Sequence, residues 1–200
     1  MTEVRTALLA GLAALSAWEA LAVVLAVTYL LLAIRQNAWC WAAALSSAAI
    51  YLVLMFEAQL YMQSLLQLFY MAMAAYGWWH WLRGAGGDEL PVTSWRRSDH
   101  VLPLVLILAP GLAVGWFLAA YSDAAYPYLD ALAACGAIVT TWMVARKVLQ
   151  NWHYWLVIDA VSVYLYASQG LWLTALLFLA YLFLILVGYR RWRASMPAHA

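Results

Sequence analysis

Apolar runs about twenty residues long follow one another along almost the whole chain, separated by short polar or basic turns. A helix needs about 20 apolar residues to cross the hydrocarbon core of a bilayer, so each run predicts one membrane crossing. The longest polar stretch, residues 83–100, is rich in Gly and Arg and predicts a linker. The crossings are expected near residues 17–35, 38–56, 59–82, 101–120, 127–147, 152–169 and 171–189. The predicted fold class is therefore an all-α integral membrane protein with seven transmembrane helices.

The composition supports the same class. Hydrophobic residues make up 68% of the 200 residues and charged residues only 10%, which excludes an ordinary globular surface. Residues 5–16 are not expected to be a cleaved signal, because only Arg5 flanks them and they continue into a further apolar span; a short interfacial helix is the open alternative. Cys40 and Cys135 lie inside crossings without metal-ligand neighbours, and we expect them to be small core residues.

The basic residues are unevenly distributed between the two sides of the predicted bundle. Arg5 alone is expected on one side, whereas nine of the ten Lys and Arg residues follow crossings 1, 3, 5 and 7: Arg35, Arg83, Arg96, Arg97, Arg146, Lys147, Arg190, Arg191 and Arg193. Cytoplasmic loops carry an excess of Lys and Arg. The distribution predicts an N-terminus outside and a C-terminus in the cytoplasm, and it does not indicate nucleic acid.

Two sequence similarities predict an internal repeat. Residues 37–41 (NAWCW) are similar to residues 151–155 (NWHYW), and residues 76–79 (YGWW) to residues 189–192 (YRRW), with a period of about 113 in both places. After three crossings the chain is on the opposite side of the membrane, and the fourth crossing returns it to the first side. The two repeats should therefore run in the same direction across the membrane, as in some transporters. Chance similarity of Trp-rich interfacial segments is the alternative. The chain is thus predicted to be a single transporter domain, 1–200, in a 3+1+3 arrangement: repeat 1 about 17–82, a linker helix about 101–120, and repeat 2 about 127–190.

A carboxylate in the sixth crossing is the first candidate for a binding site. Ionisable residues inside a membrane are costly and are functional-site hypotheses by default. At 100° per residue, one helical arc of about 80° contains five candidate side chains: Trp152, Trp155, Asp159, Ser162 and Tyr166. For the two indoles, an aromatic belt at the membrane interface is the alternative. The repeat pairs Asp159 with Leu45, so this polar face is expected only in the second repeat.

The third crossing carries a second polar stripe, at spacings of four, four and three residues. It consists of Gln59, Gln63, Gln67 and Tyr70. Hydrogen bonding between helices, worth about 0.6 kcal/mol per pair, and a lining for a hydroxylated ligand are equally compatible with it. Trp41, the repeat counterpart of Trp155, and Thr141 are further candidates, although threonines often bond carbonyls of their own helix.

Indole faces, a carboxylate and amides together suit one kind of ligand. Tryptophan attracts cations and stacks on flat rings, with about 0.5–2 kcal/mol gained as the site is desolvated. A flat aromatic cation with polar substituents, such as a pyridinium or thiazolium vitamin, is therefore the expected ligand. No catalytic residue, metal site or cofactor is expected, and the chain is not predicted to be an enzyme.

The motifs at residues 141–159, 76–81 (YGWWHW) and 59–67 (QLYMQSLLQ) resemble the PnuC family of bacterial vitamin transporters over nearly the whole chain. The most specific element is W-x-x-W-x-x-x-N/D, here Trp152, Trp155 and Asp159. The resemblance implies a SWEET-like fold, a homotrimer in the bacterial inner membrane, and facilitated diffusion of nicotinamide riboside, which a cytoplasmic kinase then traps. Members that carry nicotinamide riboside commonly have Asn where this chain has Asp159. Other relatives carry thiamine, deoxynucleosides or riboflavin, and we expect nicotinamide riboside, with thiamine as the alternative.

Other classes of seven-helix protein fit less well. A retinal protein needs a lysine in the last crossing, but the only lysine is Lys147. A haem protein needs facing histidines, whereas His80 is near the end of its crossing and His153 points about 100° away from Trp152. A membrane scaffold without transport is the remaining alternative. Because only one intramembrane acid is well placed, the expected mechanism is uniport.

Overall fold

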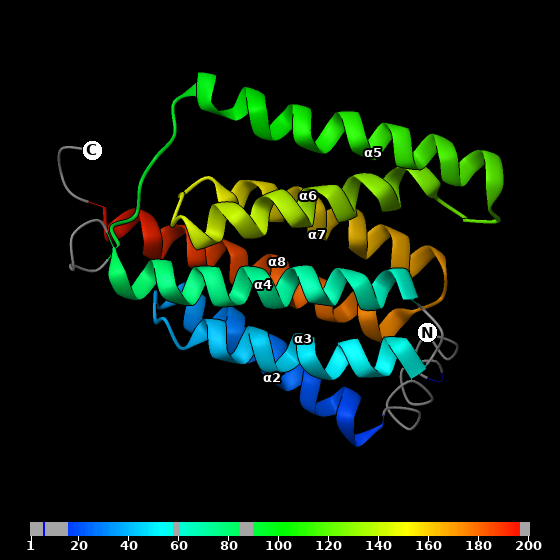
Figure 1. The fold of residues 1–200 in the computed structure, drawn as a ribbon, viewed down its shortest axis with the longest axis horizontal. Coiled ribbons are helices and arrows are strands. Elements are labelled where there is room, and N and C mark those ends of the chain that lie inside the picture. The colour runs from blue at the N-terminus through cyan, green and yellow to red at the C-terminus, as the bar shows by residue number, and fades with distance from the viewer. Residues whose placement is uncertain (1–5, 7–15, 58–60, 85–89, 197–200) are drawn as a thin grey trace. The chain divides into compact units, whose positions relative to one another are not determined.

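The computed structural model describes residue 6 and residues 16–57, 61–84 and 90–196, and these are predominantly helical (Figure 1). A short 3-10 helix, η1 (Arg97–His100), precedes α5. The α-helices of the described residues are α2 (Ala17–Ile34), α3 (Cys40–Glu57), α4 (Tyr61–Arg83), α5 (Val101–Tyr121), α6 (Pro127–Ala145), α7 (Asn151–Ser168) and α8 (Trp172–Ala194). Each corresponds to one of the seven expected crossings.

In the part of the chain that the structure describes, five helical segments are long and apolar enough to cross a membrane. They are α2, α3, α6, α8 and the continuous segment Arg97–Tyr121, which joins η1 to α5. The helices α4 and α7 are less apolar, because the two predicted polar stripes lie on them. The chain is therefore an all-α, multi-pass membrane protein.

Local side-chain chemistry fixes where α2 begins. Ser16 is its N-cap, and its Oγ accepts the Glu19 N–H at 3.1 Å while the Glu19 carboxylate accepts the Ser16 N–H at 2.7 Å. This reciprocal capping box satisfies two backbone donors that the first turn of a helix leaves unpaired. Glu19 therefore helps to cap the N-terminus of α2.

The helices α2 and α6 end in the same kind of turn. Gln36 (φ 57°) and Lys147 (φ 50°) adopt the left-handed conformation, 111 positions apart along the chain. In both turns the left-handed residue and its successor donate N–H groups to carbonyls of the preceding helix, the pattern of a Schellman motif. The four bonds, all 2.9–3.0 Å long, are Gln36 to Ala33, Asn37 to Leu32, Lys147 to Val144 and Val148 to Met143.

One compact unit contains α2, α3, α4, the turn Val144–Lys147 and the end of α8 from Val187. Within it α3 packs against both α2 and α4 (Figure 1). The buried indoles of Trp41, Trp81 and Trp192 form an edge-to-face cluster, with centroid distances of 5.5 Å and 6.1 Å. Gly77 makes room for it, because a Cβ at that position would overlap the Trp41 ring.

Two of these indoles donate hydrogen bonds to the Schellman turns. Trp81 Nε1 donates to the carbonyls of Val144 and Ala145 at 3.3 Å and 3.1 Å. Trp192 Nε1 donates to the carbonyl of Ala33 at 2.9 Å. Trp192 therefore makes the same kind of contact as Trp81. The sequence similarity instead aligns Trp192 with Trp79, which lies two residues before Trp81. Each turn is thus held by an indole from a helix far away in sequence.

The other compact unit contains α5, α6 up to Met143, α7 and most of α8. Gly111 and Gly115, one helical turn apart on α5, allow close approach to α6. A Cβ at Gly111 would lie 2.7 Å from the Leu132 side chain, and one at Gly115 2.9 Å from the Tyr128 Cα. Small residues four apart are a common means of close helix packing in membranes. They fix α5 directly on α6.

The described part of the predicted linker, residues 90–100, is anchored by side chains. Gln150 Oε1 accepts the Trp95 N–H at 3.0 Å, and its Nε2 donates to Ser94 Oγ at 2.7 Å and to the Trp95 carbonyl at 3.2 Å. His100 Nδ1 lies 2.8 Å from the Tyr154 hydroxyl. The segment that leads into α5 is therefore bonded to the start of α7.

Candidate functional site

The helical face of α7 that the sequence singles out is its buried face. Trp152, Asp159 and Ser162 are 2%, 4% and 7% exposed, and Trp155 and Tyr166 are half-buried. On the opposite side of the helix, Val157 is 65% exposed and Tyr164 56%. The indoles and the carboxylate are thus turned into the protein and away from acyl chains.

Asp159 has no hydrogen-bond or salt-bridge partner among the described residues. Buried polar groups are almost always hydrogen-bonded, and a buried charge without a partner is costly. Farther along the same face, Tyr166 stacks on Phe178 of α8 with ring centroids 5.3 Å apart. The carboxylate therefore retains its capacity to accept hydrogen bonds, on a face that neighbouring aromatic packing holds in place.

Two further buried polar atoms in the same unit also lack a protein partner within the described part of the chain. They are Thr140 Oγ1 and Asn151 Oδ1, both on residues with 0% exposure. Thr141, by contrast, donates to the Ala137 carbonyl of its own helix at 2.7 Å, as threonines commonly do. The sequence indicates Thr140 only weakly, and the position of Asn151 in the repeated Asn motif is the one signal that marks it.

The polar stripe of α4 belongs to the other unit and is only partly described. Gln59 lies outside the described residues, and of Gln63 only the backbone, in α4, is described. Gln67 and Tyr70 are half-buried. Trp41 is 1% exposed and packs on Trp81, and its Nε1 has no hydrogen-bond partner among the residues described. A role for these residues in binding stays a prediction.

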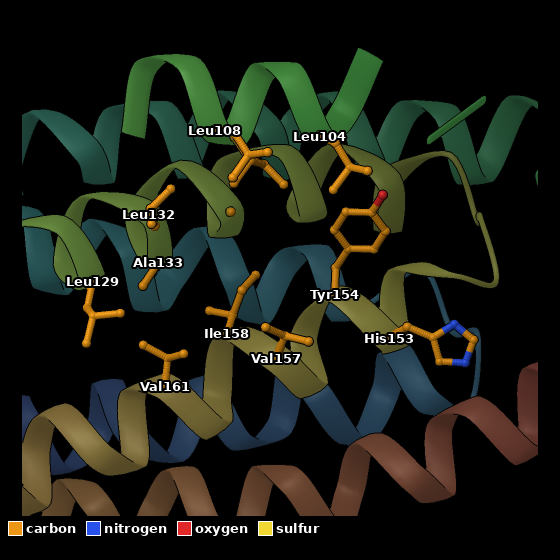
Figure 2. A pocket seen from close by; sticks show the side chains of 12 residues that line it. Leu104, Leu108, Leu129, Leu132, Ala133, His153, Tyr154, Val157, Ile158 and Val161 are labelled. Atoms are coloured by element: carbon orange, nitrogen blue, oxygen red, sulfur yellow. The ribbon is translucent and has the colours of Figure 1, made fainter. Parts of the chain in front are cut away.

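A cavity of about 440 Å³ lies between α5, α6 and α7 (Figure 2). Its walls are almost entirely aliphatic, with Leu104 and Leu108 from α5 and Val157 and Ile158 from α7. At 100° per residue, the α7 residues that line it lie about 100–160° around the helix from Asp159. This apolar cavity is therefore separate from the carboxylate face.

A second cavity, of about 800 Å³, lies in the unit that contains α2, α3 and α4. It is lined by Arg35, Gln36, Asn37, Ala38, Trp39, Trp78, Trp81, Leu82 and Lys147. None of the α7 candidates contributes to it. The sequence treats Lys147 as a loop cation, but its side chain is only 3% exposed.

A family model and two known transporters match most of this chain. A family model described as nicotinamide mononucleotide transporter matches residues 16–194. The nicotinamide riboside transporter PnuC of Escherichia coli K12 is 27% identical, over 70% of this chain and 70% of its own length. The riboflavin/roseoflavin transporter RibM of Streptomyces davaonensis is also 27% identical, over 84% of this chain and 81% of its own.

A solved structure shares the fold. The crystal structure of the vitamin B3 transporter PnuC superposes with a TM-score of 0.72 and covers 100% of this chain and 90% of that one. The identity between the two is 17%, so the likeness concerns the fold.

Proposed function

Because the chain belongs to the nicotinamide mononucleotide transporter (PnuC) family, whose model covers residues 16–194, we propose that it carries nicotinamide riboside across the membrane. It is a membrane transporter of this family and not an enzyme. The transport we propose is facilitated diffusion, with the imported vitamin trapped by a downstream kinase. The buried carboxylate of Asp159, which has no partner among the described residues, is the observation that carries the choice of a cationic substrate.

The proposed binding face is Trp152, Trp155, Asp159, Ser162 and Tyr166 of α7. A pyridinium ring stacked on an indole gains from both the flat contact and the cation–π attraction, and a carboxylate one turn farther along balances its charge. Sugar hydroxyls supply donors for the carboxylate and partners for Ser162. A nicotinamide riboside molecule would therefore give the Asp159 carboxylate the partner that it lacks among the described residues.

Riboflavin is a second candidate, favoured by the larger share of the chain that RibM matches. Its ring is flat but uncharged, so it would leave the charge of Asp159 uncompensated. Thiamine is a flat cation like nicotinamide riboside and remains an alternative on charge alone. Calorimetric titration of the purified chain with all three vitamins separates the candidates. If riboflavin binds most tightly, the charge argument is wrong. If thiamine binds most tightly, the charge argument holds and the proposed substrate changes to thiamine.

The proposed architecture is seven crossings in a single domain of 3+1+3 parallel repeats. The 18 residues of α7 span about 27 Å at 1.5 Å per residue, close to the thickness of the hydrocarbon core. The Schellman turns 111 positions apart, each bonded by an indole, support the repeat. The excess of basic residues supports an outside N-terminus and a cytoplasmic C-terminus in a bacterial inner membrane.

Uniport can be tested directly with the purified chain in liposomes. Labelled nicotinamide riboside should equilibrate across the membrane without an ion gradient, at a rate that saturates with concentration. Strict dependence on a sodium or proton gradient would contradict uniport, and absence of saturable uptake would favour a scaffold that does not transport. The homotrimer implied by family resemblance predicts a protein mass of three chains in detergent by light scattering.

A further inference from the structure

The second cavity lies where the end of α2, the start of α3 and the end of α4 meet the turn at Lys147, all within one compact unit. Its volume of about 800 Å³ is within the usual range for small-molecule sites. Nothing in the proposed transport step uses it, since that step rests on α7.

The charged residues that line this cavity are both basic. Among the described residues, Arg35 and Lys147 are the charged ones in its lining, and none of the nine lining residues carries a carboxylate. Arg35 is exposed, whereas Lys147 is 3% exposed with its ammonium 4.7 Å from the centroid of the Trp81 ring. The aromatic contact fixes the position of the ammonium. Two cations at one small cavity favour an anion and disfavour a cationic vitamin.

The aromatic lining suits a flat ring. Trp39 is 63% exposed, and Trp78 packs edge-on against it with centroids 5.1 Å apart. The contact with Trp78 orients the Trp39 ring and leaves much of its surface open. An indole presented in this way is a stacking platform for a heterocyclic base.

We propose that this cavity binds a phosphate ester attached to a flat ring, that is, a nucleoside monophosphate. The phosphate lies between Arg35, which can donate two parallel hydrogen bonds, and the Lys147 ammonium. The ring stacks on Trp39. This site is separate from the α7 face and does not depend on which vitamin is transported. The same phosphate chemistry is present in phospholipid headgroups, which lack the ring.

The test is calorimetric titration of the full chain in phosphatidylcholine nanodiscs. Adenosine monophosphate is the probe, adenosine supplies the ring alone, and inorganic phosphate supplies the anion alone. We expect adenosine and phosphate each to bind at least tenfold more weakly than adenosine monophosphate. Raised salt should weaken binding of the nucleotide, because Arg35 is exposed and its charge is screened. Equal affinity for the nucleotide and the nucleoside would overturn the proposal.

Variants assign the binding to the cavity. Arg35→Gln and Lys147→Gln should each weaken adenosine monophosphate binding at least tenfold. Glutamine already occupies the left-handed position of the equivalent turn, at Gln36, so the backbone at 147 accommodates it. Arg190→Gln is the matched control, because Arg190 is exposed, lies in the same unit and does not line the cavity. Variants that bind as tightly as this control would refute the site.

Nanodiscs that also contain phosphatidylglycerol distinguish the two sources of phosphate. Binding of adenosine monophosphate in neutral nanodiscs supports a soluble nucleotide. Retention of phosphatidylglycerol that depends on Arg35, without nucleotide binding, supports a phosphate site occupied by lipid headgroups. If neither occurs, the cavity has no phosphate site and the proposal is wrong.

Discussion

Replacing Asp159 by Asn removes one negative charge from the buried face of α7 and preserves the size of the side chain. Asp159 is 4% exposed and has no partner among the described residues, so its charge is poorly compensated in the ligand-free protein. The substitution is therefore expected to have opposite effects on stability and on binding.

The expected changes in melting temperature and in ligand affinity both follow from the burial of Asp159. A buried charged group without a partner costs at least about 1 kcal/mol, so Asp159→Asn should raise the melting temperature by about 2–4 °C for a chain of this length. Two opposite charges about 5 Å apart interact by about 3 kcal/mol at an effective dielectric constant near 20. Part of this gain offsets desolvation of the ligand. The resemblance implies Asn at this position in carriers of nicotinamide riboside, but an amide does not balance the charge of the pyridinium ring. In this chain we therefore expect a loss of about 1.4 kcal/mol or more, at least tenfold in affinity for nicotinamide riboside.

Differential scanning fluorimetry and calorimetric titration of the same detergent preparation measure both effects. Asp123→Asn is the matched control, since Asp123 is an exposed aspartate between α5 and α6 and its replacement should change neither quantity. Affinity for riboflavin, which has no positive charge, should not fall in Asp159→Asn. Unchanged affinity for nicotinamide riboside in a folded variant would remove the carboxylate from the binding site.

Other substitutions test the packing. Gly77→Ala places a Cβ inside the Trp41 ring and should lower stability by about 1–3 kcal/mol in thermal unfolding; a native-like melting curve would contradict the close contact. Trp192→Phe removes the indole donor from the Ala33 carbonyl, which still accepts the Gln36 N–H, so it should cost about 0.5–1.5 kcal/mol in the same assay; no change would mean that the bond is dispensable. Gly170→Ala meets no neighbouring atom but forces a φ of 76° on alanine, so a loss of about 1–2 kcal/mol should come from the backbone alone, and an unchanged melting temperature would exclude it.

The helices were predictable from the sequence because long apolar runs and turn residues mark them clearly. Expected starts at residues 17, 101 and 127 coincide with the first residues of α2, α5 and α6. The end of α8 differs: the apolar run stops at Tyr189, but the helix continues to Ala194. The end of an apolar run marks the edge of the membrane, and arginines both favour helix and interact well with its C-terminal dipole.

The buried face of α7 was predictable because helical periodicity alone brings Trp152, Asp159 and Ser162 together. Features that depend on contacts between residues far apart in the sequence were not predictable. Neither Gln36 nor Lys147 is a glycine, so no local signal marks the left-handed turns. The cavity with Arg35 and Lys147 needs residues more than 100 positions apart, and a single sequence contains no record of that proximity.

The hydrogen bonds that Trp81 and Trp192 donate are relevant to the evolutionary origin of such a chain. Trp81, from the first half, bonds the turn of the second, and Trp192, from the second half, bonds the turn of the first. Two identical three-helix subunits around a twofold axis would form both bonds at once, each giving one donor and receiving one. Gene fusion of such a dimer would preserve the pair unchanged, and a half expressed by itself would have to dimerise to satisfy its own turn.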